Sequence, residues 1–310
     1  MIGYILRRLL ATVVTLWLLA TLGFFLVELI PGDPARQLAG PTASIATVER
    51  IRHAYGFDRP FLSRYAEAID RYAHGDLGFS FSRSEEVRTV IARGFGNTLL
   101  LTGLAFIGEI AIAIPLAVSI VRSRRRWTDW LLLGSAGATS ALPTFLVGLL
   151  LLYVFAFRLE WFPLGGGGPI FSRTYVLPVL TVAVPYGLVL ARLLRTSLLE
   201  EREKSYMVFA LARGERESAV IWRHLLPNAL LPLLSVLALD FAGLFATVAV
   251  VEVVFSIQGV GSDLFGAIRR VDTELIVGIA IIAGIIVAVV NLVADLAVLI
   301  IDPRVRAKVG

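Results

Sequence analysis

Six long apolar segments constrain the fold of this 310-residue chain more than any other feature of its sequence. Each has about 20 residues or more, which is enough for an α-helix to cross roughly 30 Å of hydrocarbon while satisfying its own backbone hydrogen bonds. The mean hydropathy of +0.80, with 17% charged residues, excludes an ordinary soluble domain. We therefore predict an all-α polytopic membrane protein with six spans, at residues 9–30, 97–121, 130–157, 175–194, 228–254 and 275–300.

The distribution of positive charge predicts the side of the membrane on which each loop lies. Six spans put both termini on the same side as residues 122–129 and 195–227, and these four regions together contain 15 Lys or Arg residues. The opposite short loops, 158–174 and 255–274, contain 4. Because Lys and Arg are enriched in cytoplasmic loops, we predict cytoplasmic termini. The same pattern explains the net charge of +5 without a nucleic-acid partner.

Residues 31–96 are the one sizeable hydrophilic segment, and we predict that they form a small helical extracytoplasmic insertion. The sequence at 31–34, Pro-Gly-Asp-Pro, is typical of a turn after the first span. Two amphipathic stretches follow, near 47–55 and at 61–73. Ser84 is then predicted to cap a third helix, because two acidic residues stand directly after it.

These observations predict the domain organisation of the chain. The first span takes residues 1–30, and residues after 302 form a short tail. The regions are then 1–30 as the first transmembrane helix, 31–96 as the extracytoplasmic loop domain, 97–302 as a permease core of five transmembrane helices that includes the cytoplasmic loop 195–227, and 303–310 as a cytoplasmic tail.

The loop between the fourth and fifth spans carries the most distinctive local pattern. Residues 205–213 have helical spacing, and Gly214 follows as a helix stop, since glycine adopts the left-handed conformation without a Cβ clash. A second helical run, 218–225, leads to Pro227, which suits a first helical turn. The sequence predicts a helix, a sharp turn and a second helix beside the membrane.

This loop resembles the signature of the integral-membrane permeases of ATP-binding-cassette importers. That signature is Glu-Ala-Ala, three residues, Gly, nine residues and Ile-x-Leu-Pro, and the matching positions are Ala210, Gly214, Leu226 and Pro227. The departures are Val208 and Phe209, in place of Glu and the first Ala, and His224, in place of Ile. Peptide-transporting members have a Tyr-x-x-x-Ala-x-Ala-x-Gly form, which is fitted by Tyr206, Ala210, Ala212 and Gly214.

In that family the loop forms a coupling helix that sits in a cleft of the ATPase subunit. The resemblance therefore implies that residues 206–227 couple this chain to an ATPase. From the residues alone, an amphipathic loop lying on the bilayer surface is the alternative.

Further elements are similar to those of the dipeptide, oligopeptide and nickel permease family, whose branch includes glutathione importers. They are Pro-Gly-Asp-Pro at 31–34, Gly-Asp-Leu-Gly at 75–78, Val-Glu-Val-Val-Phe at 251–255 with Gly-Val-Gly at 259–261, Asn-Leu-Val-Ala-Asp at 291–295, and Asp-Pro-Arg-Val-Arg at 302–306. The long N-terminal extension resembles the first of the two permeases in such systems.

This resemblance implies a type I importer permease fold in the inner membrane and a set of partners. They are a second homologous permease, two ATP-binding-cassette ATPase subunits or domains, and an extracytoplasmic solute-binding protein. ATP and Mg would be bound by the ATPases, with no cofactor in this chain.

The sequence contains no recognisable catalytic or metal-binding pattern. The only lysines are Lys204 and Lys308, so the chain has no P-loop. The histidines, His53, His74 and His224, are far apart in sequence, and there is no cysteine. Gly259 to Asp263 is interpreted as a turn. We predict a non-catalytic subunit without a metal site.

Two acidic residues near the middle of predicted spans are the remaining chemical signal. Glu109 lies in the second span and Asp240 in the fifth, where carboxylates are costly unless they face protein or water. Structural pairing and a water-lined translocation path that meets a cationic solute group remain open. The acids also leave open an ion- or proton-coupled secondary carrier. That class often has an internal repeat, which is not evident here, so we favour the importer permease.

Overall fold

The computed structural model describes residues 2–29, 34–39, 43–54, 56–123, 125–166, 168 and 172–301. The expected turn at 31–34 and the expected tail at 303–310 therefore lie wholly or mostly outside the described residues. The chain divides into two compact units. The larger unit contains Phe95–Ser262 and Val289–Gly310, and the smaller unit contains Ile2–Gly94 and Asp263–Ala288.

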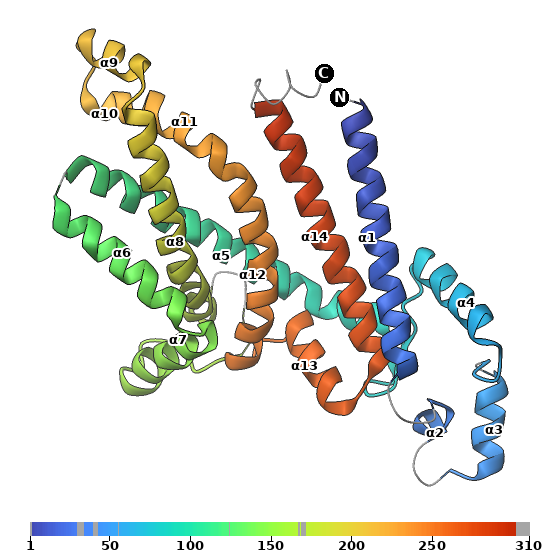
Figure 1. Cartoon of the computed structure of the whole chain (residues 1–310). Coiled ribbons are helices and arrows are strands. Elements are labelled where there is room, and N and C mark those ends of the chain that lie inside the picture. The colour runs from blue at the N-terminus through green and yellow to red at the C-terminus, as the bar shows by residue number, and fades with distance from the viewer. Residues whose placement is uncertain are drawn as a thin grey trace. The chain divides into compact units, whose positions relative to one another are not determined.

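The described residues are almost entirely helical (Figure 1). The elements are α1 (Ile2–Leu29), α2 (Pro34–Ala39), α3 (Ile45–Ala54), α4 (Phe61–Ala73), β1 (Phe79–Ser80), β2 (Glu85–Glu86), α5 (Val87–Ser123), α6 (Arg126–Ala141), α7 (Thr144–Leu151), the π-helix η1 (Leu152–Arg158), η2 (Arg173–Tyr175), α8 (Val176–Arg202), α9 (Ser205–Ala212), α10 (Glu217–Val220), the π-helix η3 (Ile221–Leu225), α11 (Leu226–Leu230), η4 (Leu231–Leu233), α12 (Leu234–Val254), α13 (Val260–Arg270) and α14 (Thr273–Ile301).

Five helical segments among the described residues are long and apolar enough to cross a membrane, and a bent pair brings the number to six. The bent pair corrects the prediction of one continuous third span at 130–157. Its two halves, Arg126–Ala141 and Thr144–Arg158, are bent by 101°. Pro143 lacks an N–H group and disfavours helical geometry in the residue before it, and Leu142 is extended, with φ −93° and ψ 129°.

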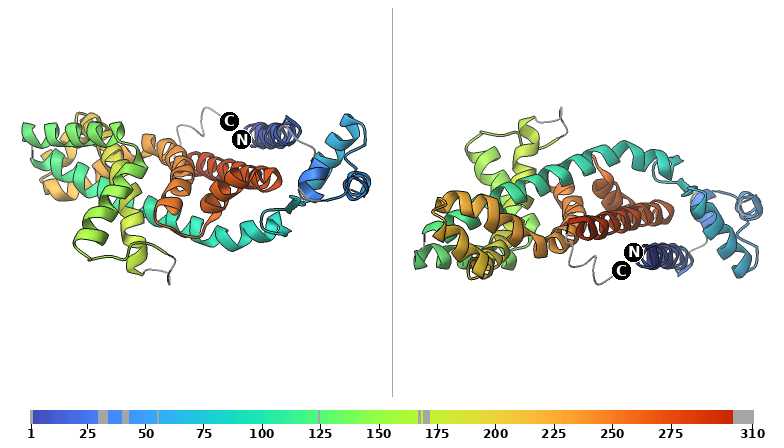
Figure 2. Two further views of the ribbon diagram at one scale, coloured as in Figure 1. Left: turned by 90° about the horizontal axis from the view of Figure 1, so that it is seen from below. Right: turned by 90° about the horizontal axis from the view of Figure 1, so that it is seen from above.

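Helix α1 lies beside α14 in the smaller unit (Figures 1 and 2). The two helices approach closely, since a Cβ on Gly23 would lie 2.6 Å from Val277 Cγ1. Helix α4 packs on α1 through Phe24, which meets the rings of Phe61 and Tyr65 edge to face at centroid distances of 5.4 Å. The amphipathic helices predicted near 47–55 and at 61–73 are confirmed as α3 and α4.

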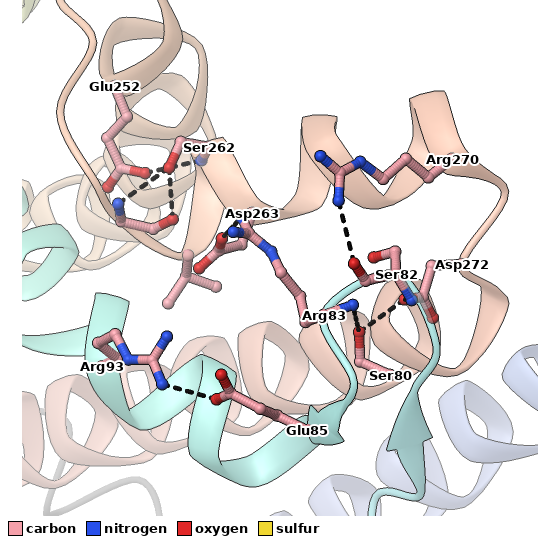
Figure 3. A network of polar contacts seen from close by, with 12 residues as sticks. Ser80, Ser82, Arg83, Glu85, Arg93, Glu252, Ser262, Asp263, Arg270 and Asp272 are labelled. Atoms are coloured by element: carbon pink, nitrogen blue, oxygen red, sulfur yellow. Dashed lines mark hydrogen bonds and ion pairs between the residues drawn. The ribbon is translucent and has the colours of Figure 1, made fainter.

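A short hairpin in the smaller unit is fixed by Asp272 (Figure 3). The buried Asp272 carboxylate accepts hydrogen bonds from Ser80 Oγ at 2.6 Å and from the Ser82 N–H at 3.0 Å. The expectation that Ser84 caps a helix is wrong, because the two acids after it pair with β1 and α5 begins only at Val87. Strand pairing uses the backbone groups that the cap would have needed.

The larger unit is built around α8, which packs against α6, α7, α11 and α12. Its buried apolar side chains form two clusters, one toward each end of α8. The core of the first includes Leu190, Leu194, Leu198, Met207, Ala210, Val220, Ile221, Leu225 and Leu226. The start of the fifth span and the loop before it therefore pack on α8.

A buried carboxylate at the end of the fifth span holds the following loop in the larger unit. Glu252 is fully buried, and its two oxygens accept hydrogen bonds from Thr98 Oγ1 at 2.6 Å and from the Ser262 N–H at 3.0 Å (Figure 3). Thr98 Oγ1 in turn accepts the Val260 N–H at 2.9 Å. The turn expected from Gly259 to Asp263 is wrong, since α13 begins at Val260.

Candidate functional site

The loop that follows α8 forms the helix, turn and helix that the sequence predicts. Helices α9 and α10 lie at one end of α8 (Figure 1). Gly214, between them, has φ +79°, which confirms its predicted left-handed conformation. The run predicted at 218–225 begins one residue earlier and continues into the π-helix η3.

The residues predicted to contact an ATPase do not share one exposed surface. Ala210 and Leu226 are buried, and they pack in the cluster that also holds Met207, Val220 and Ile221. The exposed members of the predicted set are Tyr206, Ala212, Gly214 and Pro227. The small residue at position 210 therefore allows α9 to pack on its own loop.

Tyr206 on α9 contacts α8 through Glu201. Its hydroxyl donates a hydrogen bond of 2.6 Å to Glu201 Oε2, and Lys204 forms an ion pair with the same carboxylate. Burial and the hydrogen bond to Glu201 raise the pKa of Tyr206 to about 12, so the phenol keeps its proton at neutral pH. These contacts fix the angle at which α9 leaves α8.

Two further polar contacts close the loop, and the sequence did not predict them. His224 Nε2 lies 3.2 Å from Glu215 Oε2, and Arg202 Nη2 lies 3.4 Å from Glu217 Oε1. His224 stands where the resembling signature has Ile. The available signal was the acidic residue directly after Gly214, which a histidine in the second helix could reach.

Phe209 is the residue of this loop that the sequence analysis missed. Its side chain is 71% exposed, although it lies between buried positions on α9. Met207 and Ala210 face inward at helical spacing, so Phe209 projects from the opposite face. Phe209 therefore leaves apolar area exposed on a helix that is packed on its other side.

The two intramembrane acids lie near each other in the larger unit. Glu109 is completely buried. Asp240 is close enough to interact with it electrostatically. Two carboxyl groups this close in a low-dielectric interior repel each other when both are ionised, so a proton or a cation stabilises the pair.

A polar cavity of about 230 Å³ lies where the third span breaks. Asp240 is its charged lining residue, and the other lining residues are Thr139, Ser140, Leu142, Thr144, Pro185, Tyr186 and Val189. The break at Pro143 and the packing of α8 and α12 bring these side chains together. In the part of the chain that the structure describes, no three His, Cys, Asp or Glu residues are grouped as metal ligands.

The fold and these two sites define a polytopic helical membrane protein with a glycine-turned loop between its fourth and fifth spans. Residues 110–307 match the family described as binding-protein-dependent transport system inner membrane component, and residues 1–102 match the N-terminal region of such membrane components. The chain belongs to this family of transport permeases.

Curated relatives match over the whole length of the chain. The glutathione transport system permease protein GsiC of Escherichia coli is 32% identical over 308 residues, which cover 99% of this chain and 100% of the relative. GsiC of Shigella flexneri has the same identity and coverage. These matches confirm the predicted resemblance to the peptide and oligopeptide permease branch.

Solved structures share the fold. A MetNI methionine ABC transporter in an inward-facing conformation matches with a TM-score of 0.54 and 17% identity over 69% of this chain and 96% of that chain. An amino acid ABC transporter has a TM-score of 0.52 and 17% identity over 67% of this chain and 92% of that chain. The predicted type I importer permease fold is confirmed, and the importer permease is favoured over the secondary carrier.

Proposed function

We propose that this chain is the first permease of a pair that imports peptides or a similar small solute such as glutathione. A solute-binding protein delivers the solute from outside, and a second permease completes the path. Two ATPase subunits bind ATP and Mg and drive transport, while this chain itself binds no cofactor. Full-length identity of 32% with glutathione permeases supports this solute class.

ATP-dependent uptake into vesicles tests the proposed solute class. The complete complex is purified and reconstituted, and labelled peptide is offered with unlabelled glutathione or other peptides as competitors. We expect competition within this class. Uptake that requires no ATP, or that none of these solutes reduces, would contradict the proposal.

The observation that supports the proposed coupling is that Phe209 is exposed on a loop that polar contacts hold in place. The Tyr206 hydroxyl joins α9 to Glu201 of α8, and polar contacts on both sides of Gly214 brace the loop, so a force on α9 is transmitted to α8. The buried Ala210 and Leu226 support α9 from behind, and Phe209 is the apolar side chain offered to the ATPase cleft. Residues 206–227 thereby connect ATP hydrolysis to movement of the spans.

Replacing Phe209 with alanine is expected to weaken ATPase binding by about tenfold or more, because burying a phenylalanine side chain stabilises a contact by roughly 1.5–3 kcal/mol. The measurement is the affinity of the purified ATPase for the permease pair in nanodiscs. Phe157→Ala is the matched control, since Phe157 is 60% exposed on a different helix. Equal affinities for the two variants would exclude Phe209 as the contact.

We further propose that the termini and the α9–α10 loop are cytoplasmic. The excess of Lys and Arg in these regions supports this orientation. A cysteine replacing Asp76 should react with an impermeant maleimide from outside intact cells, and one replacing Ser218 should react only after permeabilisation. Both positions are exposed. Labelling of Ser218→Cys from outside would reverse the topology.

Glu109 and Asp240 are proposed to border the translocation path. The cavity at Asp240 supports this placement, since it sits at a break in a span and has polar walls. Irregular backbone at membrane depth is tolerated where it is buried in protein or lines a water-filled cavity. The second permease would complete the wall opposite the cavity.

A further inference from the structure

Three of the hydroxyl groups around the cavity at the break of the third span, those of Thr139, Ser140 and Tyr186, point their hydrogens away from it. Thr139 Oγ1 donates to the Ser135 carbonyl at 3.0 Å, and Ser140 Oγ donates to the Ala136 carbonyl at 2.8 Å. Each hydroxyl has one hydrogen, so the oxygen lone pairs remain as acceptors. These two residues of the cavity wall present acceptors only.

The Tyr186 hydroxyl also donates its hydrogen away from the cavity, to Thr247. Thr247 Oγ1 donates its hydrogen to the Gly243 carbonyl at 2.9 Å, so in its 2.9 Å contact with Tyr186 the Tyr186 hydroxyl is the donor. The Tyr186 oxygen therefore also offers lone pairs. With the Asp240 carboxylate, the polar lining accepts hydrogen bonds at four side chains.

The break brings two helix ends to the cavity, the negative C-terminal end of α6 and the positive N-terminal end of α7, which begins at Thr144. Helix α6 ends at Ala141, next to the cavity, and the last carbonyls of a helix lack intrahelical donors and carry the negative end of its dipole. Ser140 and Leu142, on either side of this end, both line the cavity. Broken membrane helices use such ends to coordinate cations.

Glu109 places a second carboxyl group next to Asp240. It is fully buried, and it interacts with Asp240 by charge and by a side-chain hydrogen bond. Among the described residues, no Lys, Arg or His lines the cavity. A buried carboxyl pair is costly when both groups are ionised, and either a shared proton or a cation in the cavity would offset that cost.

We propose that the cavity at the break of the third span is a cation-binding site, in which Asp240 binds the positively charged group of a solute in transit. The oxygens of Ser140 and Tyr186 accept hydrogen bonds from that group, and Glu109 adds a second carboxyl group behind Asp240. An ammonium group, with three donors and no acceptor, fits the acceptors that Asp240, Ser140 and Tyr186 present. This inference rests on the proposed import function and specifies the solute chemistry that the permease itself selects.

The first test compares two peptides that the reconstituted wild-type complex both transports, one with a free amino terminus and one with an acetylated amino terminus. Asp240→Asn should lower ATP-dependent uptake of the free-amine peptide by about tenfold and change uptake of the acetylated peptide by less than about twofold, as for loss of a charge-assisted hydrogen bond. Glu160→Gln, which removes an exposed carboxylate away from the cavity, is the matched control.

The second test asks whether a free inorganic cation is the occupant, and it does not require transport. The thermal unfolding midpoint of the purified complex is measured in NaCl, in KCl and in the chloride of N-methyl-D-glucamine. If a small cation binds, Na⁺ or K⁺ raises the midpoint of the wild type and not that of Asp240→Asn. A wild-type complex without ATP-dependent uptake would refute the importer, while this measurement would still test the cation site.

Selective loss of the free-amine peptide and a cation-dependent midpoint would each support a cation site. The first result would identify a solute group as the cation, and the second would identify a free inorganic ion. Equal loss of both peptides in Asp240→Asn, with no cation-dependent midpoint, would overturn the inference and make Asp240 a structural residue. Should Asp240→Asn fail to assemble, Tyr186→Phe keeps the ring and removes one acceptor. Tyr186→Phe is expected to lower uptake of the free-amine peptide selectively, by a smaller factor than Asp240→Asn does. An equal effect on the uptake of both peptides in this variant would also overturn the inference.

Discussion

An alanine at Gly259 is expected to destabilise the permease by about 3 kcal/mol or more and to prevent most of it from assembling. The added Cβ would overlap three atoms of the Glu252 carboxyl group. That carboxylate is fully buried and is held by donors from Thr98 and Ser262, so moving it leaves a buried charge and its donors unpaired. The yield of assembled complex and its thermal unfolding midpoint measure the effect.

Gly103→Ala is the matched control for this prediction, because a Cβ on Gly103 in α5 meets no atom within 4 Å. It should leave the midpoint unchanged or raise it, since glycine inside a helix is destabilising by roughly 0.5–1 kcal/mol relative to alanine. Adding Glu252→Ala to Gly259→Ala should cost less than the sum of the two single changes, because the overlap disappears with the carboxylate. Identical midpoints for Gly259→Ala and Gly103→Ala would contradict the proposed packing.

A valine at Gly214 is expected to uncouple ATP hydrolysis from the solute while the spans still fold. Gly214 has φ +79°, and a β-branched residue in this conformation costs about 1–2 kcal/mol. Beyond the two chain neighbours, no atom of the described residues lies within 4 Å of the added Cβ, so we attribute the effect to the backbone. Relief of that strain changes the angle between α9 and α10 and moves Phe209. Solute-stimulated ATP hydrolysis by the reconstituted complex should fall by about tenfold.

Gly214→Asn separates backbone conformation from side-chain volume at the same exposed site. Asparagine tolerates the left-handed conformation far better than valine does, so this variant should keep most of the solute-stimulated activity. Both variants should show wild-type yields of assembled membrane protein. If Gly214→Asn and Gly214→Val lose activity equally, the left-handed turn is not the reason that glycine stands here.

Several parts of the fold follow from local sequence. The six apolar runs predicted the spans, and the amphipathic run at 61–73 predicted the bounds of α4, because length and periodicity are properties of the segment itself. Gly214 was predictable for a related reason: a left-handed turn needs glycine whatever packs around it. The hairpin that replaces the cap expected at Ser84 depends instead on Asp272, a residue far along the chain.

The break in the third span shows where local sequence stops being sufficient. Pro143 interrupts its span, yet Pro115 and Pro185 lie within the continuous helices α5 and α8. A proline removes one backbone donor in each case. Whether the helix kinks or breaks depends on the neighbouring groups that satisfy the freed carbonyl.

By itself, the sequence determined that this chain is a six-span helical membrane protein with a glycine-turned loop after its fourth span, since apolar length and glycine placement act locally. Only the tertiary structure decided that Ala210 faces inward while Phe209 projects from the loop, because α9 is apolar on every side and Val220 and Ile221 select the buried face from across the turn. The tertiary structure also determined where the cavity forms, because Ser140, Tyr186 and Asp240 come from three different helices and meet only when those helices pack.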